Sequence, residues 1–152
     1  PKDMQHPFDG RMHGGAFHDN VRADFEGVCA GDLAESQRQI LRTLVGTYIG
    51  WSADGHAGVK MREVDKHLDE TWFSWMGSTA NDGPFYYRVH SPVVLIEFDH
   101  HPGVVFDNLM PTPNHVHTIV REPNGGDYGN DLLRQHHERF DHSYGHHRAR
   151  ND

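Results

Sequence analysis

The clearest pattern along the chain is a run of apolar residues at helical spacing between residues 33 and 49. Apolar side chains recur there every three or four positions, as on one face of a helix. They are Leu33, Ile40, Leu41, Leu44, Val45, Tyr48 and Ile49. Asp32 and Glu35 fit a capping box at the start, and Gly50 suits the position after the last turn. We predict a helix over 33–49, in which the buried stripe is Ile40, Leu41, Leu44 and Tyr48.

A shorter helix is predicted after the turn at Asp54-Gly55, with apolar positions Ala57, Met61, Val64 and Leu68. From Thr71 onward the apolar period changes from helical to alternating, which is typical of strands. Strong turn signals interrupt this region at residues 81–84 and 124–126. The predicted strands are 71–76, 85–90, 93–100 and 115–121. A last helix is predicted over about 129–140, with His136 on its apolar stripe.

This order of elements predicts an α+β fold, with a small antiparallel sheet of three to four strands and helices packed on one face. Residues 1–31 are rich in Gly, His and Asp, and we expect an extended, loop-rich arm. Residues 32–140 form the single α+β domain of this prediction, and 141–152 a polar, His-rich tail. The predicted strand from Val93 is apolar on both faces, so it needs cover on both.

Charge narrows the classes of partner. The 152 residues include 22 acidic and 14 basic side chains, for a net charge of −8, so we expect no nucleic-acid partner. The longest apolar run, residues 93–96, is far shorter than the roughly 20 residues of a membrane span. We therefore expect a soluble protein of unknown compartment. The chain shows no signal peptide, but its first residue is not Met, so an exported protein with its signal removed fits too.

The strongest chemical signal is His115-Val116-His117 in the last predicted strand. Alternate side chains of a strand share a face, so both imidazoles point one way and Val116, Thr118 and Val120 point into a packed face. Two such imidazoles suit a divalent transition metal, Zn, Fe or Cu. A carboxylate of the preceding strand, from the pair Glu97 and Asp99, can complete a site of two histidines and one carboxylate. We expect the third ligand to be Glu97 or a histidine from elsewhere in the chain. The alternative is an exposed strand face in a chain that contains 15 histidines.

Three further residues are candidates for catalytic roles. Asp99 shares a face with Glu97 and can move protons, as can His136 in the last predicted helix. Arg88 can hold a substrate carboxylate through its guanidinium. For Arg88 the simpler interpretation is an ion pair with a carboxylate on the neighbouring strand, Glu97 or Asp99. For His136 it is a packed, hydrogen-bonded histidine of the core.

Three stretches of the sequence resemble the C-terminal half of a bacterial family catalogued as domain of unknown function 3500. They are FHDNVRADFEGVCAGDL, YYRVHSPVVLIEFDH and NHVHTIVREPNGGDYGNDLLRQHHE, and the resemblance runs from about Phe17 to Phe140. The family pattern falls on Glu97, Asp99, Tyr87, Arg88, His115, His117, Thr118, Arg121, Asp127, Gly129, Asp131, Leu133, Arg134 and His136.

The resemblance brings no established activity, but it implies that family members are about twice as long as this chain. We therefore expect a partner, either another protein chain or another copy of this one. Three functions stay open: a metalloenzyme acting on a small-molecule substrate, by hydrolysis or by oxidation; a non-catalytic metal-binding or assembly subunit; and a structural half-domain.

Overall fold

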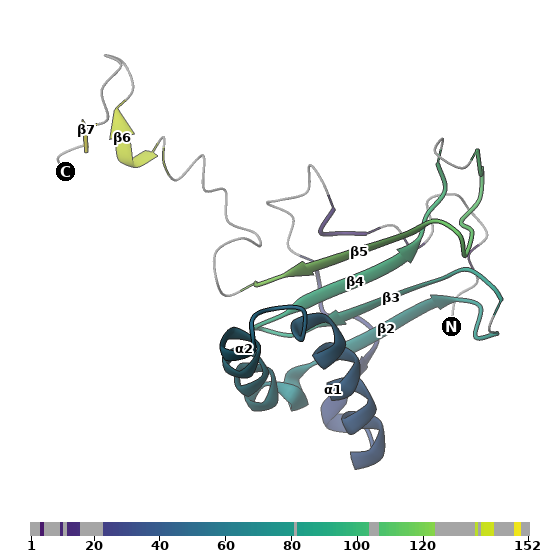
Figure 1. Cartoon of the computed structure of the whole chain (residues 1–152), viewed down its shortest axis with the longest axis horizontal. Helices are drawn as coiled ribbons and strands as arrows, with labels where there is room; N and C mark the ends of the chain where they lie inside the picture. The colour runs from purple at the N-terminus through teal and green to yellow at the C-terminus, as the bar shows by residue number, and fades with distance from the viewer. Residues whose placement is uncertain are drawn as a thin grey trace.

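The computed structural model describes residues 4, 10, 12–15, 23–80, 82–103, 107–123, 136, 138–141 and 148–149. Its main feature is a five-stranded antiparallel sheet in the order β1-β2-β3-β4-β5 (Figure 1). The strands are β1 (Val28–Cys29), β2 (Trp72–Gly77), β3 (Phe85–His90), β4 (Leu95–His100) and β5 (Val116–Arg121). The α+β class is confirmed. The sheet exceeds the predicted three to four strands because part of the expected arm, β1, pairs with β2.

Two helices, α1 (Glu35–Ile49) and α2 (Asp54–Lys66), lie on one side of the sheet (Figure 1). Short 3-10 helices, Ala30–Asp32 and Leu68–Glu70, flank this helical layer. The last predicted helix is described only at His136, Glu138 and Arg139, which are helical; residues 129–135 and 137 lie outside the described residues. Beyond it, β6 (Phe140–Asp141) pairs with β7 (Arg148–Ala149) in a separate two-stranded sheet.

The predicted capping box of α1 is wrong. Asp32 belongs to the preceding 3-10 helix, and the residue that caps α1 is Ala34, which has no side-chain acceptor. Gln37 takes part of this role, because its Oε1 accepts the backbone N–H of Ala34 at 3.0 Å.

The buried stripe of α1 is also displaced from the prediction. Leu41, Val45 and Ile49, four residues apart, are buried against the sheet, whereas Leu44 and Tyr48 are only partly buried. Ile40 is 70 % exposed, so its predicted burial is wrong. The apolar face of α1 is wider than the part of the helix that packs on the sheet, so residues at the edge of that face stay in solvent. Ile40 lies at this edge.

The two faces of the sheet differ in chemistry. The helix-covered face carries an aromatic cluster in which Tyr87 and Phe98 stack at 5.2 Å between ring centroids. The other face carries buried polar side chains: Tyr86, Arg88, His90, Glu97 and Asp99. Alternation along β3 and β4 sends adjacent residues to opposite faces, so one pair of strands contributes to both layers.

The chain's own N-terminal residues lie against the polar face. A Cβ atom added at Gly14 would stand 3.2 Å from Glu97 Oε2 and 3.2 Å from Leu95 Cδ2. Leu95, Ile96 and Glu97 are therefore fully buried without a second chain. The predicted need of β4 for cover on both faces is met by the helices on one side and by this N-terminal segment on the other.

Strand β5 is less well covered than predicted. Val116 is 43 % and Val120 48 % exposed, so the expectation that they point into a packed face is wrong. Both valines stand on the helix side, because they pair with His100 and Ile96, but the helical layer packs over the preceding strands.

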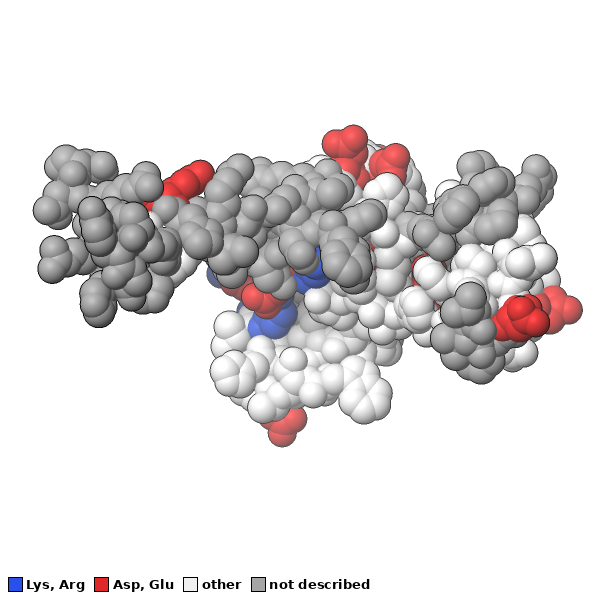
Figure 2. All heavy atoms as spheres, turned by 90° about the horizontal axis from the view of Figure 1, so that it is seen from above, with Lys and Arg blue, Asp and Glu red and all other residues white. Residues whose placement is uncertain are grey.

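One face of the molecule shows few charged side chains among the described residues (Figure 2). In the view of Figure 2, basic side chains gather in one place beside acidic ones, and the other acidic side chains are scattered. Within the described part of the chain, no helix is long and apolar enough to cross a membrane.

Candidate metal centre

The imidazoles of His115 and His117 meet at the start of β5. Their Nε2 atoms are 3.1 Å apart, so both rings lie on one side of the strand, as predicted. Two nitrogen donors about 2.1 Å from one metal ion are themselves about 3.0–3.4 Å apart. The spacing of the two nitrogens therefore suits a shared ion.

Asp99 adds a buried carboxylate from the adjacent strand. It pairs in register with His117, and its side chain is only 1 % exposed. Its Oδ2 lies 2.9 Å from His101 Nδ1, and its Oδ1 lies 3.9 Å from His117 Nδ1. Both carboxylate oxygens therefore face histidine rings. Oδ1 is buried and has no hydrogen-bond partner.

His101 is the member of the group that the sequence analysis missed. Its backbone N–H donates to His115 O at 2.7 Å, which extends the β4–β5 pairing by one step. Its ring centroid lies 4.3 Å from that of His117 and 5.3 Å from that of His115. Asp99 and His101 are two residues apart, as His115 and His117 are, so each pair is expected to share a face of its strand. This spacing is the sequence signal that could have identified His101.

The loop after β4 holds these rings in place. Asn108 Nδ2 donates to the backbone oxygens of His101 and Met110, both at 2.8 Å. Gly103 passes close to His115, because a Cβ atom there would be 3.3 Å from His115 Cε1. The loop thus packs on one imidazole and fixes the backbone of another.

The surroundings favour neutral imidazole at His117. Burial lowers the pKa of His117 first, and the neighbouring His101 lowers it further, while Asp99 opposes the shift. A neutral ring nitrogen is the form that binds a metal ion. Asp99, His101 and His117 each offer a ligand atom within 4.8 Å of the others, and they could hold a metal ion together.

Glu97, the carboxylate predicted as the third ligand, has other partners. Its Oε1 accepts hydrogen bonds from Tyr86 Oη at 2.6 Å and from the His13 N–H at 2.8 Å. Its Oε2 accepts the Gly14 N–H at 2.7 Å. Burial and the charge of Glu97 raise the pKa of Tyr86, which keeps the phenol protonated as a donor. The structure groups Asp99, rather than Glu97, with the histidines.

Arg88 forms an ion pair, but with a partner that sequence reasoning did not identify. Its Nη2 contacts Glu26 and lies 3.2 Å from the backbone oxygen of Asp24. Both partners belong to the N-terminal segment rather than to β4. The guanidinium is buried, and its Nε has no hydrogen-bond partner.

His136 lies outside the group that includes Asp99. Its ring contacts Phe140 at 5.0 Å between centroids, and the residue is half-buried. The tail histidines 142, 146 and 147 lie outside the described residues.

This arrangement can support metal chemistry at the edge of the polar face. Imidazole nitrogens suit Zn, Fe and Cu, and a carboxylate that holds the far nitrogen of a ligating imidazole is a common second contact in such sites. His117 is partly open to solvent, which leaves room for water or a small substrate beside it.

A scan against protein-family models matches residues 2–130 to the model described as "Protein of unknown function (DUF3500)". Searches of curated proteins and of solved structures find no match. The match covers the five-stranded sheet, both helices and the His/Asp group. It confirms the family resemblance seen in the sequence. The chain belongs to the DUF3500 family.

Proposed function

We propose that this chain binds one divalent transition metal ion, Zn, Fe or Cu, through His101, His115 and His117. The observation that carries the proposal is the 3.1 Å separation of the Nε2 atoms of His115 and His117. Asp99 belongs to the group of residues that could hold an ion with His101 and His117, but in this proposal it stays behind the rings. His101 would supply the third donor through Nε2, because its Nδ1 faces Asp99.

Asp99 acts in this proposal as the carboxylate that orients two of the rings. It lies on the Nδ1 side of both His101 and His117. A carboxylate in that position selects the Nδ1–H tautomer and leaves Nε2 available for the metal. This differs from the arrangement expected from sequence, in which Glu97 bound the ion directly.

We propose that the chain uses this metal centre as an enzyme that acts on a small molecule. The ion would supply a Lewis acid or activate oxygen. Asp99, on the Nδ1 side of the rings and only 1 % exposed, would take part by stabilising positive charge that develops on His101 and His117. The roles predicted from sequence for Arg88, in holding a substrate carboxylate, and for His136, in moving protons, stay predictions; Arg88 pairs with Glu26, and His136 is not a member of the Asp99 group.

Metal stoichiometry tests the proposal. The purified full chain, dialysed against buffer, is expected to retain close to one equivalent of metal by elemental analysis. His115→Ala and His117→Ala should each abolish the tight equivalent, whereas His67→Ala, a surface histidine at the end of α2, should not. Removal of residues 142–152 should also leave it intact. Loss of several weak ions on that truncation, with no effect of His117→Ala, would refute the proposal.

A second candidate, a non-catalytic assembly subunit, is favoured by one observation. Val116 and Val120 present exposed β-branched side chains along one row of β5. Association with another copy or another chain would cover them. Light scattering at micromolar concentration tests this candidate: a stable dimer or larger species supports it, and a monodisperse monomer with a cooperative melt contradicts it.

A further inference from the structure

Helix α1 carries a second row of side chains in addition to the buried row of Leu41, Val45 and Ile49. The second row advances by alternating steps of four and three residues, which is the spacing that packs one helix along another. We call it the outer row of α1, and it consists of Leu33, Gln37, Ile40, Leu44, Thr47 and Trp51.

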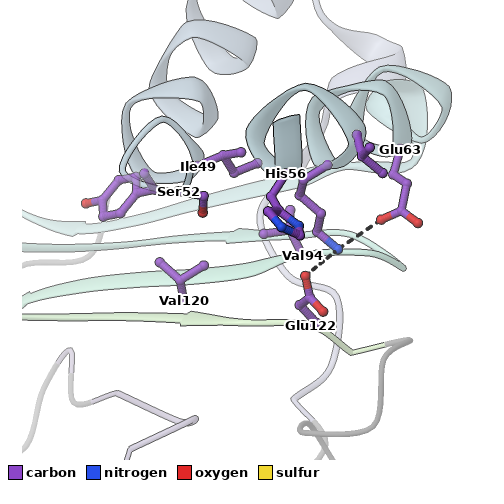
Figure 3. Close-up of a pocket in the computed structure, with 10 residues that line it drawn as sticks. Ile49, Ser52, His56, Glu63, Val94, Val120 and Glu122 are labelled. Carbon is purple, nitrogen blue, oxygen red and sulfur yellow. Dashed lines mark hydrogen bonds and ion pairs between the residues drawn. The ribbon is translucent and has the colours of Figure 1, made fainter. Parts of the chain in front are cut away.

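The outer row points away from the sheet. Ile49, at the end of the buried row, lines a cavity of about 510 Å³ between the helices and the sheet (Figure 3). Ile40 lies five residues before Val45, so the two side chains point about 140° apart around the helix axis. Ile40 is accordingly 70 % exposed, and Trp51, just after the helix, is 91 % exposed.

An apolar groove of about 310 Å³ lies beside the outer row. Leu33, Ile40 and Leu44 line it from the helical layer, and Val28 of β1 and Phe73 of β2 line it from the sheet. Val28 is 39 % exposed, and Leu33 and Leu44 are only partly buried. The row and the groove therefore leave apolar surface in water that a second element can cover.

The outer row contains no charged side chain. The three charged residues of α1 are Glu35, Arg38 and Arg42, and all are paired within the chain. Arg38 contacts Glu35 at 2.6 Å and Asp69 at 2.8 Å, and Arg42 contacts Asp65 at 2.6 Å. A charged partner would find no opposite charge on this row. Two copies of the chain, each with a net charge of −8, would meet here without juxtaposing like charges.

The outer row has the same order from either end: apolar, polar, apolar, then apolar, polar, apolar. We propose that α1 packs antiparallel against α1 of a second copy of this chain. About a two-fold axis between Ile40 and Leu44, Ile40 would then meet the partner's Leu44. Gln37 would meet the partner's Thr47, and Leu33 would meet the partner's Trp51. Every apolar position then faces an apolar one and every polar position a polar one, as a self-complementary two-fold contact requires.

The polar pair is chemically matched in this arrangement. Gln37 Oε1 accepts the backbone N–H of Ala34 at 3.0 Å, and Thr47 Oγ1 donates to Leu44 O at 2.7 Å. Gln37 therefore presents amide N–H groups, and Thr47 presents oxygen lone pairs. The amide of one copy can donate to the hydroxyl oxygen of the other, so the contact need not bury an unsatisfied polar group.

Sedimentation equilibrium of the full chain tests the proposal. A contact through one helix of each copy belongs at the small end of protein interfaces, so we expect a dissociation constant of about 10–100 µM. The chain should be monomeric at about 1 µM, where Ile40 keeps its exposure, and mostly dimeric at about 500 µM. A chain that stays monomeric at the higher concentration would overturn the proposal.

Three substitutions of exposed apolar residues locate the contact. Ile40→Glu places a charge opposite the partner's Leu44 and should raise the dissociation constant at least about tenfold. Val59→Glu, on α2 at a position 54 % exposed, and Val120→Glu, on β5 at a position 48 % exposed, should leave it unchanged. A dimer that Val120→Glu dissociates and Ile40→Glu does not would assign the contact to β5 and refute the proposal.

Disulfide cross-linking tests the antiparallel register. Gln37→Cys and Thr47→Cys are each made in a Cys29→Ser background, which removes the one native cysteine. Oxidation of the two variants mixed together should cross-link them, whereas either variant alone should stay uncross-linked. Cross-linking of each variant with itself would mean a parallel pair and would overturn the proposed register.

The dimer contact and the proposed metal centre can fail independently. The histidines and α1 lie on opposite faces of the sheet, so treatment of the chain with a chelator should leave the dissociation constant unchanged. Ile40→Glu should likewise leave the metal content unchanged. A dimer that dissociates when the metal is removed would place the contact at the metal centre instead of α1.

Discussion

Asp99 on β4 stands directly opposite His117 on β5, with Asp99 Oδ1 3.9 Å from His117 Nδ1. Glu97, two residues earlier on the same face, stands opposite Ile119 instead. The two acidic residues look equivalent in sequence, but they lie two residues apart on β4 and therefore have different neighbours. Asp99 meets imidazoles, and Glu97 meets backbone N–H groups of the N-terminal segment.

Substitution of these two carboxylates should separate their roles. Asp99→Asn should weaken metal binding by about 10–100-fold without changing its stoichiometry, because the second contact of the imidazoles is lost. Glu97→Gln should leave the metal affinity within about twofold of the wild type and lower only the thermal stability, through lost charge-assisted hydrogen bonds. Competition with a chromophoric chelator measures both affinities. Loss of metal from Glu97→Gln but not from Asp99→Asn would assign the carboxylates the other way round.

The displaced stripe of α1 predicts a sharp contrast between two neighbouring residues. Leu41→Ala removes a buried side chain and should lower the free energy of unfolding by about 2–5 kcal/mol. Ile40→Ala, at a position 70 % exposed, should change it by less than about 0.5 kcal/mol. Urea unfolding of both variants measures these values. Equal losses would mean that α1 packs through a different face.

Gly27 is expected to tolerate no side chain. Its φ is +101°, and an added Cβ atom would stand 2.1 Å from Phe73 O. Gly27→Ala should therefore lower the unfolding free energy by about 1–3 kcal/mol, through backbone strain and the clash.

The matched control for that substitution is Gly55→Ala on α2, where an added Cβ meets nothing within 4 Å. It should raise the unfolding free energy by up to about 1 kcal/mol, because alanine has the better helix propensity. Thermal melts of the two variants should shift in opposite directions. A shift in the same direction would disagree with this placement of the N-terminal segment against β2.

His90 should make the fold less stable in mild acid. Burial lowers the pKa of His90, opposed by a backbone hydrogen bond with Asp24. The unfolded chain then binds a proton near pH 6.5 that the folded chain takes up only at lower pH. The unfolding free energy should thus fall as the pH drops below about 6.5 and continue to fall until the folded pKa is reached.

The contribution of this one residue is isolated by His90→Gln. Urea unfolding at pH 7.5 and pH 5.5 should show a larger loss of stability in the wild type than in the variant. The other histidines titrate in both proteins and cancel in the comparison. An identical loss in the two proteins would show that His90 is not buried in the neutral form.

Much of the candidate site was visible as a local pattern. The same-side placement of His115 and His117 follows from strand geometry alone, and the structure confirms it. His101 was missed because it follows the last residue of β4 and was predicted to begin a Pro-rich loop. Its backbone contact with His115 joins residues 14 positions apart, and no local pattern contains that pairing.

The sequence by itself determined the periodicities: the two helices, the strands β2 to β5 and the alternation that puts two histidines on one side. These depend on backbone geometry and on which side chains repeat every two or every three to four residues. Tertiary structure decided which carboxylate meets the histidines, because strand register is set between segments distant in sequence. It also decided that Val45 is buried while Ile40 is exposed, and that the N-terminal segment covers Glu97. Those outcomes depend on packing between elements, which no single stretch of sequence encodes.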